Sequence, residues 1–410
     1  MDGTHPPTSD NTHHVDLVIV GAGLTGMALA LAAGSIGLNA AVIERAPRAA
    51  LLADTFDGRV TAIARGSKIM LDRLGAWQWL DANAQPINDI RVNEGYGIAQ
   101  VHYDHREVGG EPLGWIAENR HIRQALLTAI DACPLIKILN GSTITEIDQT
   151  PNRAAATLAD GTALAAPLLC LADGRHSYWR GQVGIDATVK AYGQFGLVAT
   201  FAHEKPHHGV AVERFFPDGP FAMLPITGGR SSIVWALEER RAQRLAELDD
   251  AAFTAEVESR FGETLGALQL EGPRWSYPLS LVVTQAYSKG RVALVGDCAH
   301  GIHPIAGQGW NLALRDVAVL AEIIGERAAV GLDFGDVDAL DHYSRWRRAD
   351  GVALIGITDG INSLFANDIS AIKMAREAGL SLVEQMTPAK QFFMRHAMGL
   401  TGDVPALLRL

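Results

Sequence analysis

The feature that most constrains the fold is an apolar run followed by three closely spaced glycines near the N-terminus. Residues 16–20 read Asp-Leu-Val-Ile-Val, and Gly21, Gly23 and Gly26 follow. This pattern predicts a strand, a tight turn and a helix: Gly21 allows the turn, Gly23 lets a pyrophosphate approach the backbone, and Gly26 lets the helix pack on the strand. The helix N-terminus then offers unpaired N–H groups and a positive dipole end to the pyrophosphate.

A carboxylate follows at the distance that this motif requires. A second apolar strand, residues 40–43, ends at Glu44, 18 residues after Gly26. Such a carboxylate is placed to bind the 2′-hydroxyl of an adenosine ribose, and we group Arg45 with it. A 2′-phosphate would meet like charge here, which argues against the adenosine of NADP. The sequence therefore predicts an ADP-containing dinucleotide, although glycines at two of these positions also occur as ordinary helix-packing residues.

Composition excludes several classes of protein. With 410 residues the chain is longer than one typical domain, and its net charge of −11 without a basic run argues against a nucleic-acid partner. The three cysteines are far apart and are expected to be buried, reduced side chains. No stretch reaches the roughly 18 apolar residues of a membrane span. We expect a cytoplasmic protein that meets a membrane, if at all, from the surface.

Two later strands also end in carboxylates. The apolar residues 168–172 run into Asp173, with Ser177 and Arg180 beyond, and residues 291–295 run into Gly296 and Asp297. Ligands of open α/β sheets bind at the carboxyl ends of the parallel strands, so both aspartates are predicted near the dinucleotide. Asp297 would accept a hydrogen bond from a ribityl hydroxyl. Asp-Gly is also a common turn sequence, which is the alternative for Asp173.

A glycine-rich segment then precedes a helix expected over residues 312–327. Its backbone N–H groups, at a helix start, can stabilise negative charge on a reduced or oxygenated ring. The residues predicted beside that ring are Pro304, Gly307, Gln308, Gly309 and Asn311. His300 and His303 have no third ligand nearby, so no metal is expected.

Three other polar residues allow two interpretations each. Arg59, in the loop over residues 46–60, is either a surface cation or a flavin-facing or substrate-facing group. Arg120 and Gln124 lie one turn apart on a helix expected over residues 119–130. This pair either binds a cofactor phosphate or ring edge, or forms a solvated helix face.

Together these segments resemble the FAD-dependent aromatic hydroxylases, the group that includes para-hydroxybenzoate hydroxylase. The three glycines with Glu44, the Asp173 segment, and the segment from Gly296 through Gly309 match its three fingerprints in order, over nearly the whole chain from Val15. Trp310 stands where many relatives carry a smaller apolar residue. The segments that look like the ubiquinone-biosynthesis hydroxylases within this group are residues 57–60, 118–120, 358–365, 376–380, 388–390 and 395–400.

The resemblance implies an α/β fold: a Rossmann-like FAD-binding domain with an inserted antiparallel-sheet substrate domain and C-terminal helices. Short alternating segments over residues 188–284 favour such a sheet, interrupted by one helix at 250–261, and a further helix is expected over 61–74. The expected divisions are a disordered tail (1–14), the FAD-binding domain (15–75, 119–185 and 285–335), the substrate domain (76–118 and 186–284) and the C-terminal helical region (336–410).

The implied reaction is hydroxylation of the aromatic ring of a polyprenylated ubiquinone precursor, a phenol or quinone. FAD, reduced by NAD(P)H or another transient donor, reacts with O2 to form a C4a-hydroperoxide that transfers OH to the ring. This agrees with the lack of an evident acid/base constellation, since the chemistry belongs to the cofactor. A five-carbon tail unit is worth about 4 kcal/mol of burial, so the tail is expected in an apolar tunnel or in lipid.

Other functions remain open from the sequence. A related flavin hydroxylase of a soluble aromatic compound would carry a cation in its pocket to pair with a substrate carboxylate. A flavin reductase, a halogenase, or a FAD-binding scaffold subunit of a biosynthetic complex are further alternatives. Apolar positions on the C-terminal helices could contact the inner membrane surface or a protein of ubiquinone biosynthesis.

Overall fold

A six-stranded sheet forms the centre of the computed structural model, which describes residues 11–97, 100–365 and 370–410. Five adjacent strands are parallel, as the alternation of apolar strands and helices predicts, and only β19 at one edge is antiparallel. The order across the sheet is β19 (Ser288–Lys289), β20 (Val292–Leu294), β13 (Leu168–Leu171), β2 (Leu17–Val20), β3 (Ala40–Glu44) and β9 (Ile136–Asn140).

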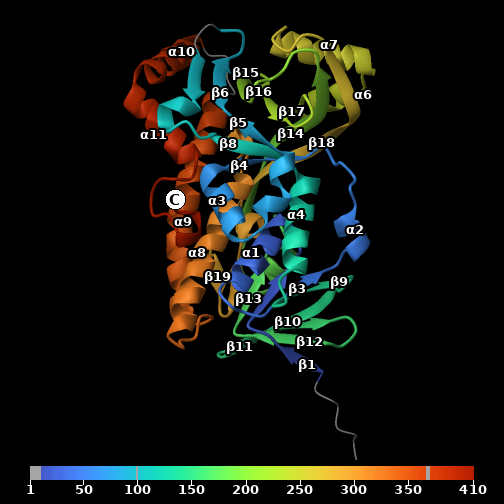
Figure 1. The fold of residues 1–410 in the computed structure, drawn as a ribbon, viewed down its shortest axis with the longest axis vertical. Helices are drawn as coiled ribbons and strands as arrows, with labels where there is room; N and C mark the ends of the chain where they lie inside the picture. Colours follow the sequence, from blue (N-terminus) through green and yellow to red (C-terminus); the bar gives the residue numbers. More distant parts are fainter. Residues whose placement is uncertain (1–10, 98–99, 366–369) are drawn as a thin grey trace, which may run out of the picture.

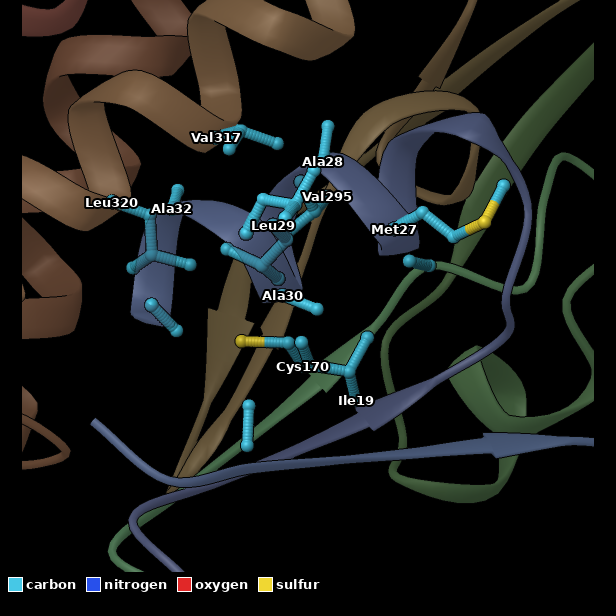
Figure 2. Packing of buried hydrophobic residues seen from close by; sticks show 14 of the residues in the cluster. Ile19, Met27, Ala28, Leu29, Ala30, Ala32, Cys170, Val295, Val317 and Leu320 are labelled. Carbon is cyan, nitrogen blue, oxygen red and sulfur yellow. The ribbon is translucent and has the colours of Figure 1, made fainter. Parts of the chain in front are cut away.

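Helix α1 (Leu24–Ser35) lies between this sheet and helix α8 (Gly309–Ala329), as Figure 2 shows. Ile19, Cys170 and Val295 on the sheet side and Val317 and Leu320 on α8 enclose it. Because α1 is covered on several sides, including by α4 (Asn119–Asp131), nearly all its residues are small or apolar. Cys170 and Cys298 are buried as predicted, whereas Cys133 is only partly buried.

The other face of the central sheet carries a four-stranded sheet. Its first strand corrects the prediction of a disordered tail: residues 12–14 pair in parallel with β12, whereas residues 1–10 lie outside the described ranges. The strands are β1 (Thr12–His14), β12 (Ala163–Ala166), β11 (Arg153–Leu158) and β10 (Ile144–Thr150).

A second, eight-stranded sheet forms the upper part of the molecule in Figure 1. The predicted antiparallel sheet is in fact mixed, because β6 pairs in parallel with β15. Two helices, rather than the one predicted, cover its outer face: α6 (Glu239–Glu247) and α7 (Asp250–Phe261). The order is β21 (His300–Gly301), β18 (Leu268–Thr284), β14 (Ala187–His203), β17 (Arg230–Glu238), β16 (Gly219–Ile226), β15 (Val210–Phe216), β6 (Asp89–Glu94) and β7 (Gln100–Asp104).

A three-stranded sheet lies between these two parts. It consists of β4 (Val60–Ala64), β8 (Gly114–Glu118) and β5 (Ala84–Ile87). The helix expected over residues 61–74 is therefore shorter than predicted, because residues 60–64 pair with β8 and the helix α3 is Arg65–Arg73. A short helix, α2 (Arg48–Leu52), also interrupts the expected loop.

The C-terminal region is helical, as predicted. Helix α9 (Val337–Phe365) packs against α8, and α10 (Ser370–Gln385) packs against β7 and α11 (Thr387–Ala397). Figure 1 shows these helices along one side of both main sheets. None of the helices in the described ranges combines the length and the apolarity that crossing a membrane requires.

Candidate flavin and substrate site

The three glycines near the N-terminus each meet a different environment. Gly21 has φ +101°, and a Cβ there would lie 2.8 Å from the carbonyl oxygen of Ala172. A Cβ on Gly26 would lie 1.9 Å from the carbonyl oxygen of Gly21. Around a Cβ on Gly23, no described atom other than those of its chain neighbours lies within 4 Å. Gly21 and Gly26 are thus required by packing, whereas Gly23 leaves open space at the start of α1.

Glu44 lies against the glycine turn. Its Oε2 accepts a hydrogen bond from the backbone N–H of Ala22 at 2.7 Å, and its Oε1 accepts one from Ala46 at 2.8 Å. A carboxylate has about four acceptor positions, so two bonds leave capacity for ribose hydroxyls. Arg45, the next residue, is exposed.

Asp173 follows the end of β13 and is held by Ser177, whose Oγ donates to Oδ2 at 2.8 Å. Burial raises the pKa of Asp173, and its Oδ1 is a buried oxygen without a hydrogen-bond partner in the described part of the chain. Arg180 links this turn to the next strand end, because its Nη1 donates to the carbonyl oxygen of Cys298 at 2.9 Å. Asp173 and Arg180 thus tie the ends of β13 and β20 together.

Asp297 follows the neighbouring strand β20 and remains partly exposed. Arg175 donates to its Oδ2 from Nη2 at 3.0 Å. The preceding residue, Gly296, has φ +67°, and a Cβ there would lie 2.9 Å from Cγ2 of Thr25 in the first turn of α1. The carboxyl ends of β3, β13 and β20 therefore bring Glu44, Asp173 and Asp297 to one edge of the central sheet, on the side where α1 begins.

Asp316, a buried aspartate on α8, holds the turn at Gly296 and Asp297 in place and was not predicted from the sequence. Asp316 Oδ2 accepts from the N–H of Gly296 at 2.8 Å and contacts His300 Nε2 at 2.6 Å, while Oδ1 accepts from Arg347 Nε at 2.6 Å. Burial alone would raise the pKa of Asp316, but the charges of His300 and Arg347 hold it below its usual value. The sequence did offer a signal for this residue, because an aspartate among the apolar residues of a helix indicates a buried, paired carboxylate.

The two histidines considered for a metal face different partners. His300 contacts Asp316, whereas His303 Nε2 lies 3.3 Å from Oε1 of Gln194. Burial lowers the pKa of His303 to about 4.

One cluster of possible metal ligands does occur among the described residues. It consists of Asp89, His102 and Asp104 on β6 and β7, away from the strand-end site. Arg106 already pairs with Asp104 through both carboxylate oxygens.

The loop before α8 lies against β4. Gly307 has φ +61°, and a Cβ there would lie 2.9 Å from the Cβ of Ala62. The side chain of Asn311 forms hydrogen bonds with the backbone of β4. Its Oδ1 accepts from the N–H of Ala64 at 2.8 Å, and its Nδ2 donates to the carbonyl oxygen of Ala62 at 2.9 Å. Any contribution of Asn311 to ligand binding would therefore come from its backbone.

The other residues predicted in this loop are more open. Pro304 is exposed. Gln308 caps α8 and donates from Nε2 to the carbonyl oxygen of Ala397 at 3.5 Å. A Cβ on Gly309 would have no described atom beyond its chain neighbours within 4 Å, as at Gly23. Both helix starts, α1 and α8, thus combine first-turn N–H groups with open backbone.

Arg120 and Gln124 converge on the loop that carries Arg59. Arg120 donates to Oε2 of Glu118 at 2.6 Å, and Gln124 Nε2 donates to Oδ1 of Asp54 at 3.4 Å. Arg59 is half-exposed and donates from Nε to Oδ2 of Asp57 at 2.8 Å. All three side chains have protein partners, and their predicted contacts with a cofactor or substrate remain predictions.

An apolar cluster separates the loop before α8 from the eight-stranded sheet. The cluster joins β4, β5 and β8 to the inner face of the sheet, and its members are Ile87, Ile116, Ala211 and Ile226 with Val60, Ala62, Ile90 and Leu224 packed against them. Two surface hollows, around His207 and around Arg214, contain none of the strand-end residues. Ala62 of this cluster lies against Gly307, beside the predicted ring position.

Comparison with known families agrees with this geometry. Residues 14–356 match the FAD binding domain family. The chain belongs to this family, and it is an FAD-dependent monooxygenase. Open backbone at Gly23, a half-buried Glu44 and the partly exposed Asp297 fit that cofactor.

The chain is similar over nearly its whole length to enzymes of ubiquinone biosynthesis. It is 43% identical over 409 residues to the ubiquinone hydroxylase UbiL of Rhodospirillum rubrum, covering 99% of this chain and 95% of that one. It is 31% identical to the mitochondrial ubiquinone biosynthesis monooxygenase COQ6 of Drosophila melanogaster, covering 95% and 91%. It is 30% identical to the 3-demethoxyubiquinol 3-hydroxylase of Escherichia coli, covering 94% and 98%.

Solved structures show the same fold at lower identity. The p-nitrophenol 4-monooxygenase PnpA of Pseudomonas putida matches with a TM-score of 0.78 and 19% identity, covering 95% of this chain and 99% of that one. PqsL of P. aeruginosa, in complex with 2-aminobenzoylacetate, matches with a TM-score of 0.75 and 22% identity, covering 90% and 99%. The predicted α/β architecture with a FAD-binding domain is confirmed.

Proposed function

We propose that this monooxygenase hydroxylates the aromatic ring of a polyprenylated ubiquinone precursor, with O2 as co-substrate and NAD(P)H or another transient donor. The observation that carries the proposal is the 43% identity to a ubiquinone hydroxylase over 99% of the chain. Bound FAD supplies the reduction of O2 and the transfer of oxygen to the ring. The protein supplies binding, orientation and a site shielded from water.

The strand-end residues have separate roles in this proposal. The open backbone at Gly23 and the start of α1 bind the pyrophosphate, Glu44 binds the adenosine ribose, and Asp297 binds the ribityl chain. The start of α8, with Gly307 and Gly309, places N–H groups beside the ring. The further assigned contacts are Gly21, Gly26, Arg45, Arg59, Arg120, Gln124, Asp173 and Asn311 for the cofactor and Pro304, Gly307 and Gln308 beside the reacting atoms.

The inner face of the eight-stranded sheet forms the opposite wall of the substrate site. The partly buried members of its apolar cluster, Val60, Ala62, Ile90 and Leu224, suit an aromatic ring and the start of an isoprenoid tail. We retain the predicted division of the chain into FAD-binding and substrate domains as part of this proposal. That division places β5 and β8 in the substrate domain. Because β8 pairs with β5 on one side and with β4 on the other, the two parts share one small sheet.

A complementation series tests the proposed function. The gene is expressed in ubiquinone-deficient strains, each blocked at one ring hydroxylation, and the quinones are identified by mass spectrometry. Restored ubiquinone in at least one strain is expected and also identifies the ring carbon. Failure in every strain, together with no oxygen added to a short-tailed prenylphenol by the purified, reduced enzyme in air, would refute the proposal.

We further propose that the C-terminal helices contact the surface of the inner membrane. Leu382 is exposed on α10, and Met386 is exposed between α10 and α11. Phe392 and Phe393 are exposed on α11 next to the exposed Arg395. Large exposed apolar side chains beside a cation suit an anionic lipid surface. Sedimentation with anionic vesicles should be weakened by Phe392→Ser with Phe393→Ser. Unchanged sedimentation would favour a protein partner or no docking surface.

A further inference from the structure

An acidic side chain lies on the inner face of the eight-stranded sheet. Side chains alternate along β15, so that Val212 and Phe216 join the cluster beneath α6 and α7 while Ala211 and Phe215 lie on the opposite face. Glu213 lies between Ala211 and Phe215 in this alternation. Its side chain is therefore directed toward the interface with the FAD-binding part of the protein.

The surroundings of Glu213 are apolar. Its register partners are Ala222 on β16 and Val92 on β6. Phe215, two residues further on, stacks on Phe365 of α9 with the ring centroids 4.1 Å apart. Burial is the sole cause that raises the pKa of the Glu213 carboxyl, to about 8. Among the described residues, none forms a hydrogen bond or salt bridge with this carboxyl.

The charged side chains nearby are already paired or lie on the other face. Glu94 on the adjacent strand accepts from Arg376 Nε at 2.8 Å. Arg230 donates to Oε1 of Glu118 at 2.8 Å. Arg214, beside the unpaired acid in sequence, lies on the opposite face and packs over the ring of Phe261, the last residue of α7. Among the described residues, the cations of this face are therefore paired with acids other than Glu213.

The side chain of Glu213 is not fully covered by protein. It has an intermediate accessible surface, although its register partners on both adjacent strands are apolar. Part of this side chain therefore stays accessible at the interface between the inner face of the sheet and the rest of the protein. The same interface reaches the flavin loop, because Ala62 packs with Ala211 and Leu224 and also lies against Gly307.

We propose that Glu213 is a specificity residue of the substrate pocket, which selects rings bearing a neutral hydroxyl and rejects rings bearing a carboxylate. This inference rests on the proposed function. A protonated carboxyl donates one hydrogen bond and accepts others, so it pairs with a phenol hydroxyl or a quinone oxygen. A ring carboxylate would instead need a cation, and a second buried negative charge beside Glu213 is unfavourable.

Two ligands and three variants test this role in the FAD-loaded enzyme. The ligands are a short-tailed 2-prenylphenol and the matching prenylated 4-hydroxybenzoate, and their dissociation constants are read from the perturbed flavin absorbance. The variants are Glu213→Gln, Glu213→Ala and the control Glu247→Gln, which alters an exposed acid on α6. FAD content and the unfolding midpoint are recorded for each, since removing an unpaired carboxyl should leave both unchanged.

Wild type and the control should bind the phenol at least about tenfold more tightly than the acid, which corresponds to about 1.4 kcal/mol. Glu213→Ala should weaken phenol binding about tenfold, because one hydrogen bond to a buried group is lost. Glu213→Gln should keep phenol binding and reduce the discrimination to less than about threefold, because an amide can donate to a carboxylate.

Phenol affinity and discrimination that stay unchanged in both Glu213 variants would overturn this inference. If wild-type enzyme still hydroxylates the phenol in that case, the proposed function stands without it. If wild type hydroxylates neither ring, the proposed function fails, and the binding data for Glu213 no longer concern substrate selection.

Discussion

Substituting two neighbouring glycines, Gly23 and Gly26, by alanine should separate cofactor binding from folding. At Gly23 the backbone has φ −68° and ψ 176°, which any residue adopts, and the added methyl group meets open space. At Gly26 the methyl group would lie 1.9 Å from a backbone oxygen, whereas an ordinary contact is 3.4 to 4 Å. The first variant fills the predicted path of the pyrophosphate, and the second forces α1 away from β2.

The expected magnitudes follow from these contacts. Gly23→Ala should leave the apoprotein as stable as wild type or stabilise it by about 0.5 kcal/mol, since the unfolded chain loses freedom at a compatible position. It should weaken FAD binding by at least about tenfold, or 1.4 kcal/mol. Gly26→Ala should destabilise the apoprotein by about 3 kcal/mol, because overpacking here acts against backbone rather than a movable side chain.

Urea unfolding of both apoproteins, followed by titration with FAD, measures the two effects. Gly23→Val extends the series and should abolish flavin retention with the fold intact. Undiminished FAD affinity in both Gly23 variants would show that the pyrophosphate does not pass over this residue. Wild-type stability of Gly26→Ala would show that α1 and β2 are less tightly packed than the structure indicates.

Three further substitutions test the remaining parts of the site. Asp297→Ala should lower FAD affinity without changing the stability of the apoprotein, as measured by flavin titration and urea unfolding. Asp316→Ala leaves Arg347 buried with less compensation and should lower the free energy of unfolding by about 3 kcal/mol in urea. Burial lowers the pKa of His303 from its ordinary 6.5 to about 4, so the folded protein binds a proton at this residue more weakly than the unfolded chain does. The contribution of neutral His303 to the free energy of unfolding is therefore complete above pH 6.5 and is lost as pH falls toward 4. His303→Gln should flatten the fall in stability over that window, and an unchanged slope would contradict the assignment.

Local sequence patterns predicted the elements whose formation depends on neighbouring residues. The helix expected after the glycines is α1, and the helix expected over residues 119–130 is α4, which ends at Asp131. The glycine at position 21 does adopt the left-handed backbone that the turn requires. Three strand ends with carboxylates were also predicted, because parallel strands place their carboxyl ends at one edge.

Pairings between distant segments could not be predicted in this way. β6 joins β15 in parallel although more than a hundred residues separate them, and nothing in either segment specifies that partner. Residues 61–64 resemble the start of a helix until β8 pairs with them. The side chain of Asn311 illustrates the same limit at the site, since its engagement with β4 depends on how α8 packs.

The pairing of β18 with β21 has a mechanical consequence. β18 runs through the large sheet, and its last residues pair with His300 and Gly301, directly after the turn that carries Asp297. A hydrogen-bonded ladder resists shear between its strands, so a tilt of this end of the sheet would carry with it the turn at Asp297, the predicted ribityl contact. Under the proposed function, substrate binding on the sheet and the position of the flavin ring would therefore be coupled through this short ladder.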